Sequence, residues 1–195
     1  MHTLRCIAAE WDIVRARLFH TRLGAWLLLL AVALTWSAQD EVSLVRVAVR
    51  TGLVAGVLCA AFAAGSEADR AAFRLSLAHP TSPLALATGR WLAAAIAAAL
   101  PVAGVTATAA ITHGSPPRVV FSAAIAGFGA AAAVGGAALP AIVLGGNTVA
   151  GVVLALLAVS GATLDPSTAG SLALWHVLGP IAGVLATAAI LARRQ

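Results

Sequence analysis

The sequence predicts an all-α, polytopic membrane protein, with six transmembrane helices preceded by an amphipathic interfacial helix. Of its 195 residues, 61% are hydrophobic and 10% are charged, whereas soluble domains carry about 25% charged residues. The mean hydropathy is +0.98. Apolar runs recur along the whole chain, and a run of about 20 residues suffices to cross ~30 Å of hydrocarbon. These observations favour a chain that lies mostly within a bilayer.

The first segment, residues 1–22, is expected to be an amphipathic helix in the cytoplasmic headgroup layer. Leu4, Ile7, Trp11 and Leu18 follow helical spacing, and charged residues occupy the other faces. A solvated N-terminal tail is the alternative. A cleaved signal peptide is disfavoured, because the apolar run begins only near Leu23 and ends without a good cleavage site.

The second part, residues 23–195, is expected to form a six-helix transmembrane domain. The residues 119–164 contain no charge and are too many for one span, so they should form two. The turn between those two spans lies near Pro140 or near the Gly-Gly-Asn sequence at 145–147, and both can break a helix. The other four spans are expected at 23–38, at 43–65, from 84 or 91 to 112, and at 171–192.

Arginine asymmetry orients the spans. With both termini inside, nine arginines lie on the cytoplasmic side, and Arg46, Arg50 and Arg118 lie on the outer side, in agreement with the positive-inside rule. The outer loops are then short, at 39–42, 113–118 and 165–170. Because the arginines flank apolar runs, we expect membrane lipid as their anionic partner and no nucleic acid. This orientation fits a multi-pass protein of the cell (inner or plasma) membrane.

A charged segment at 66–83 interrupts the apolar chain on the predicted cytoplasmic side. Ser66 and Asp69 form an S-x-x-D capping pattern, and Pro80 ends the helix, which predicts a short cytoplasmic helix over 67–79. The apolar side chains of Phe73 and Leu77 on a cytoplasmic helix favour a docking element. A solvated loop with a helical bias is the alternative.

This segment resembles the permease subunits of ABC-2-type transporters, whose corresponding stretch reads E-x-E-x-G-T-L, then a proline, then G-K at the third span. Glu67 and Asp69 stand at the two acidic places and Phe73 at the apolar place, followed by Pro80 and then by Gly89 with Arg90. The family's Gly-Thr pair is replaced by two alanines, and its lysine by arginine. The six spans and short outer loops are similar as well.

The resemblance implies a transmembrane permease subunit of an ATP-driven transporter, working by alternating access beside a second, identical or sister, permease. Its coupling helix would dock on a separate ABC ATPase through Glu67, Asp69, Arg70, Phe73, Arg74 and Leu77. We expect no catalytic residue, metal or cofactor in this chain. Mg-ATP belongs to the partner, since a Walker A motif needs lysine and the chain has none. Short outer loops favour export over import, and the cargo is left open.

Arg46 and Arg50, both in the second span, are candidates for a pathway or a gate. The preferred account is simpler: the two side chains reach the outer headgroups or pair with Asp40 or Glu41. The G-x-x-x-G pairs at 52–56 and 179–183 are expected to be helix-packing seams rather than substrate sites. Cys6 and Cys59 are not expected to form a disulfide or a metal site.

Two other classes of function compete with transport. An intramembrane protease of the rhomboid type needs G-x-S-G, and phosphatidyl transfer needs D-G-x-x-A-R; the sequence contains neither. A non-catalytic membrane scaffold or assembly factor is compatible with the sequence and is the alternative to a permease. Such a scaffold would bind no ATPase through the segment 66–83.

Overall fold

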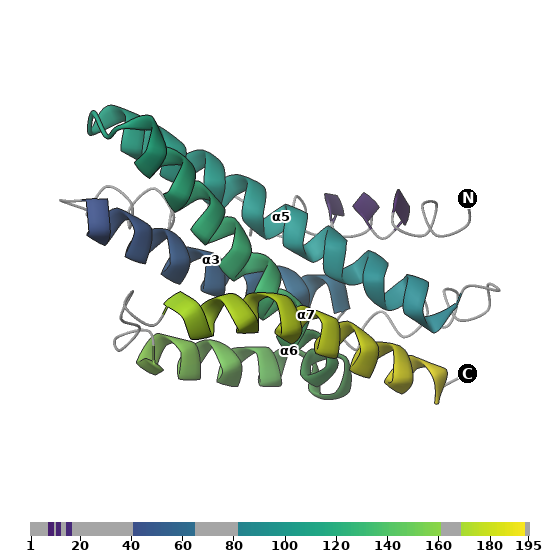
Figure 1. Cartoon of the computed structure of the whole chain (residues 1–195). Helices are drawn as coiled ribbons and strands as arrows, with labels where there is room; N and C mark the ends of the chain where they lie inside the picture. The colour runs from purple at the N-terminus through teal and green to yellow at the C-terminus, as the bar shows by residue number, and fades with distance from the viewer. Residues whose placement is uncertain are drawn as a thin grey trace.

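The computed structural model describes residues 8–9, 11–12, 15–16, 41–64, 82–160 and 169–193. These residues are almost entirely helical and contain no strand. The labelled helices are α3 (Glu41–Ala64), α5 (Pro83–Thr112), α6 (Pro117–Ser160) and α7 (Ala169–Ala192) (Figure 1). The predicted span at 23–38 and the predicted helix at 67–79 lie outside the described residues.

Three of the described helical segments are long and apolar enough to cross a membrane: Val42–Ala64, Pro83–Thr112 and Pro117–Gly146. A shorter apolar helix, His176–Ala192, lies within α7. The prediction of an all-α membrane protein is confirmed to this extent. The count of six spans and the interfacial helix over 1–22 stay predictions, since only six residues of the latter are described.

The helices run alternately in opposite directions along the bundle (Figure 1). The start of α3, the connection between α5 and α6, and the start of α7 lie at one end, which we call the hairpin end. The end of α3, the start of α5 and the end of α7 lie at the opposite end, which we call the segment end because residues 65–81 join α3 to α5 there.

Local sequence signals explain where α5 begins and ends. The hydroxyl of Ser82 accepts a hydrogen bond from the backbone N–H of Ala85 (3.1 Å), and Pro83 occupies the first helical turn, where a missing N–H costs nothing. The helix therefore starts at the earlier of the two predicted positions. At its other end Gly114 adopts a φ of 71°, and four residues later α6 has begun. This tight connection makes α5 and α6 antiparallel neighbours.

The helix α6 consists of two arms that meet at Gly146. This glycine has φ 66° and ψ −156°, a backbone conformation that is essentially restricted to glycine. Pro140 lies inside the first arm and leaves it continuous. The second arm turns back toward the hairpin end (Figure 1). Of the two turn positions left open by the sequence, the structure therefore has the turn at 145–147.

Small residues let the helices approach one another closely. A Cβ atom added to Gly52 would lie 3.1 Å from the carbonyl carbon of Gly127 on α6, and one added to Gly56 would lie 2.7 Å from Val134 Cγ1. The predicted seam at 52–56 is thus confirmed as a contact between α3 and α6. The buried core around it is mostly alanine. Leucine and isoleucine side chains such as Leu139 and Ile142 fill part of the core, whereas other large apolar side chains point outward, with Phe121 70% exposed and Val177 60% exposed.

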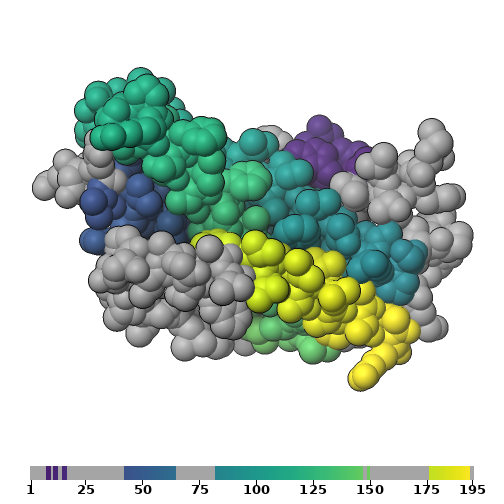
Figure 2. All heavy atoms as spheres, in the orientation of Figure 1, coloured from purple at the N-terminus to yellow at the C-terminus, as the bar shows by residue number. Residues whose placement is uncertain are grey.

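The space-filling view shows how these elements share one face of the molecule (Figure 2). Helices α5 and α7 run side by side along it, and the first turns of α6 project at the hairpin end. Exposed apolar side chains on α5, α6 and α7 suit contact with lipid chains, as expected for helices at the surface of a membrane-embedded bundle.

Candidate functional site

The six residues predicted to couple the chain to an ATPase, Glu67, Asp69, Arg70, Phe73, Arg74 and Leu77, all lie outside the described residues. The structure does describe the two helices that this segment joins. The end of α3 and the start of α5 both lie at the segment end, together with the end of α7 (Figure 1). The first part of α5 is therefore the described element that follows the predicted coupling segment most directly.

Trp91, in the third turn of α5, connects this first part of the helix to α6. Its indole Nε1–H donates a hydrogen bond of 2.9 Å to the backbone carbonyl of Ala132. The ring also packs against the two apolar clusters that α5 shares with α3, α6 and α7. A buried indole N–H needs an acceptor, and this carbonyl provides one on a neighbouring helix.

Two glycines bring α6 and α7 together beside Trp91. Pro140 has no N–H, so the carbonyl of Gly136, four residues earlier, loses its usual helical donor. Gly183 of α7 packs directly against that carbonyl. A Cβ on Gly136 would lie 2.7 Å from Pro180 and 2.8 Å from Trp91 Nε1. Trp91, Ala132, Gly136, Pro180 and Gly183 thus form one contact among three helices, which we call the three-helix junction.

Arg90 precedes this junction and is only 5% exposed. Gly89 beside it is also buried. The Gly-Arg pair that carries part of the family resemblance therefore lies in the packed part of α5 rather than on its exposed face. Burial of a guanidinium within a helix bundle is costly unless polar groups surround it. Arg90 is accordingly a structural element of this end of α5.

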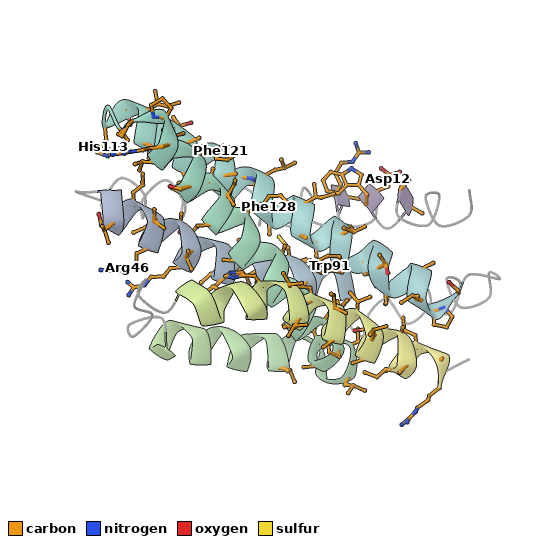
Figure 3. All side chains as sticks on the ribbon, viewed as in Figure 1. Asp12, Arg46, Trp91, His113, Phe121 and Phe128 are labelled. Carbon is orange, nitrogen blue, oxygen red and sulfur yellow. The ribbon has the colours of Figure 1, made fainter. Side chains whose placement is uncertain are left out.

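Arg46 and Arg50 lie at the hairpin end, on α3. Arg46 is exposed and points away from the bundle at the end where His113 lies (Figure 3). Arg50 is half-buried, and its Nε atom is buried without a hydrogen-bond partner among the described residues. Of the two acids suggested as their partners, Asp40 lies outside the described residues, and neither arginine forms an ion pair within them.

Among the described residues, no three His, Cys, Asp or Glu side chains come together to hold a metal ion. Cys59 is buried in α3 and is a free thiol. His176 is half-buried, with its Cδ2 atom 3.8 Å from where a Cβ on Gly129 would lie, so it packs against α6. The described side chains thus offer a helix junction and a pair of arginines, and no such group of metal ligands.

The sequence reasoning missed the role of Trp91. Its partner is a backbone carbonyl 41 residues away, and no residue pattern marks such an acceptor. Gly183 was predicted only as part of the helix-packing seam at 179–183. Pro140, one of the two predicted turn positions, lies inside the helix instead. It leaves the carbonyl of Gly136, which Gly183 contacts, without its helical hydrogen-bond donor.

No protein-family model matches this chain, and no curated protein or solved structure matches it either. The resemblance carried by residues 66–90 is therefore developed below as a proposal.

Proposed function

We propose that this chain is the transmembrane permease subunit of an ABC-type, ATP-driven transporter. It would be an exporter in the cell membrane, with six spans and both termini cytoplasmic. The observation that carries the proposal is the segment between α3 and α5, in which two acids, an apolar position, a proline and Gly89-Arg90 follow the order of the family. The cargo is not assigned.

In this proposal a separate ATPase moves the segment 66–83 during its nucleotide cycle, and the segment transmits this displacement to α5. Three features of the bundle support such a path. The segment joins α3 to α5 directly, Arg90 and Gly89 are packed within the first turns of α5, and Trp91 ties those turns to Ala132 of α6. A displacement of the start of α5 would therefore also be transmitted to the contact between α6 and α7 at Gly136 and Gly183.

The proposal requires two kinds of partner. One is an ABC ATPase that binds Mg-ATP, because the chain has no lysine and hence no Walker A motif. The other is a second permease subunit, identical or related, so that two chains together enclose the path of the cargo. Alternating access would then be a relative movement of helices within this pair.

The experiment is affinity purification of the chain from its native membrane. A stoichiometric partner with a Walker A motif is the expected result. The double variant Glu67→Arg with Arg70→Glu should lose this partner while still inserting in the membrane. A matched control is Asp12→Arg with Arg15→Glu, which reverses an exposed ion pair (3.3 Å) elsewhere in the chain without changing the net charge. This control should retain the ATPase.

Two outcomes would contradict the proposal. A stable complex without any ATPase would favour the alternative, a membrane scaffold or assembly factor. Labelling of a Phe73→Cys variant by a membrane-impermeant thiol reagent in intact cells would place the segment on the outer side, where an ATPase cannot reach it. Both native cysteines are replaced by alanine in that variant, so that any label reports position 73.

A further inference from the structure

The first half of α3 carries two arginines in an otherwise apolar stretch. Arg46 and Arg50 follow Glu41, the first residue of the helix, by five and nine positions, which is about 8 and 13 Å along the helix axis. Val42 and Val45 precede them, and Val42 is 54% exposed. Such a helix face suits lipid chains, and an arginine there needs compensation of its charge.

The described helices offer little negative charge for this purpose. Residues 82–160 and 169–193 contain no Asp or Glu. Asp12 is paired with Arg15. Glu41 lies about 13 Å from Arg50 along the axis, whereas ion pairs on a helix join residues three or four positions apart. Arg50 accordingly has no carboxylate within reach on its own helix.

The two guanidinium groups are also neighbours of the same charge. Residues four positions apart share a helix face, and like charges at that spacing repel each other. An anion bound to both groups would convert this repulsion into attraction. Arg46 is exposed and Arg50 is half-buried, so such an anion would approach from outside the bundle and contact both arginines.

We propose that Arg46 and Arg50 bind one phosphate group at the hairpin end of α3. The guanidinium fork matches the geometry of phosphate oxygens and makes paired, charge-assisted hydrogen bonds with them. The Nε atom of Arg50 is buried, so an anion from outside the bundle would be bound through the terminal guanidinium nitrogens of this half-buried side chain. The phosphate belongs to a phospholipid headgroup or to a soluble phosphate compound. The assignment does not depend on the proposed transport function.

The test uses the full chain purified in detergent and native mass spectrometry with added phosphatidylglycerol. The wild-type chain should retain one tightly bound lipid. Arg46→Gln and Arg50→Gln should each weaken this binding by about tenfold or more, as expected for the loss of a charged hydrogen-bond donor. Arg118→Gln is the matched control, because Arg118 is also exposed and also lies at the hairpin end. It should change binding less than about twofold.

A second measurement separates the two sources of phosphate. Inorganic phosphate and glycerol 3-phosphate are titrated against the lipid-free chain, with intrinsic tryptophan fluorescence and thermal stabilisation as readouts. Binding of these soluble probes that is lost in Arg46→Gln, without retention of lipid, would assign the site to a soluble compound and support the proposal. The proposal is overturned if neither lipid nor soluble probe binds the wild-type chain more tightly than the Arg46→Gln chain. Because Arg46 is exposed, that variant tests the site even if Arg50→Gln does not fold.

Discussion

Replacement of Gly183 by alanine is expected to push α7 away from α6. The new Cβ atom would lie 2.7 Å from the carbonyl carbon of Gly136 and 3.1 Å from the Cα atom of Ala137, and both are backbone atoms that no rotamer change can move aside. Ordinary carbon contacts begin near 3.4 Å. The two helices must therefore separate by at least about 0.7 Å, and a gap of 0.5–1 Å forfeits a quarter to a half of the contact energy of the atoms involved.

The free energy of unfolding follows from two opposing contributions. Overpacking of this kind costs about 1–3 kcal/mol, whereas alanine in place of glycine within a helix contributes up to about 1 kcal/mol of stability. The net expectation is a loss of up to about 2 kcal/mol, or up to about 8 °C in the melting temperature of a chain of this size. The melting temperature is measured in detergent by the loss of helical circular dichroism.

Gly104→Ala provides the matched control, since Gly104 is an exposed glycine inside α5 with no atom within 4 Å of the added Cβ. It should raise the melting temperature slightly, because only the helix-propensity contribution applies. If Gly183→Ala were as stable as Gly104→Ala, the close approach of Gly183 to the Gly136 carbonyl would be refuted.

Two further substitutions test other parts of the fold. Trp91→Phe keeps an aromatic ring but removes the donor to the Ala132 carbonyl. The free energy of unfolding should fall by about 1–2 kcal/mol, and amide hydrogen exchange should become faster in the facing turns of α6. Unchanged exchange in those turns would contradict the bridging role of Trp91. Gly146→Ala places a side chain on a backbone conformation that is essentially restricted to glycine. The free energy of unfolding should fall by about 1–3 kcal/mol, measured in the same melting assay. A variant as stable as the wild type would show that the turn is not at this residue.

Much of the helical layout could be predicted because its signals are local. Apolar run length marks the described spans, and the Ser82-Pro83 pair explains why α5 begins near the earlier of the two predicted positions. The orientation inferred from the arginines stays a prediction. The turn in α6 was less certain, because Pro140 and Gly146 both disturb a helix. A single missing N–H leaves a helix running on, whereas a glycine with positive φ lets it reverse.

The details of the candidate site were less predictable, since they depend on contacts between residues far apart in the chain. The acceptor for Trp91 is the main-chain carbonyl of Ala132. Every residue carries the same carbonyl group, so the sequence does not mark which one accepts the bond. The burial of Arg90 depends on how closely α5 packs with its neighbours, which the residues beside it do not specify. The coupling role of Glu67 and its neighbours rests on resemblance and stays a prediction.

The length of α5 has a consequence for the membrane around it. A helix of 30 residues measures about 45 Å, so it would have to incline by roughly 48° to fit wholly within ~30 Å of hydrocarbon, more than spanning helices usually do. The first arm of α6 is equally long. Part of this antiparallel pair, at the α5–α6 connection or at the opposite end, would therefore have to emerge among the headgroups or thicken the bilayer locally. In thin bilayers the emerging part would stand clear of the surface, and in thick ones it would sink into it, which would make the protein responsive to acyl-chain length.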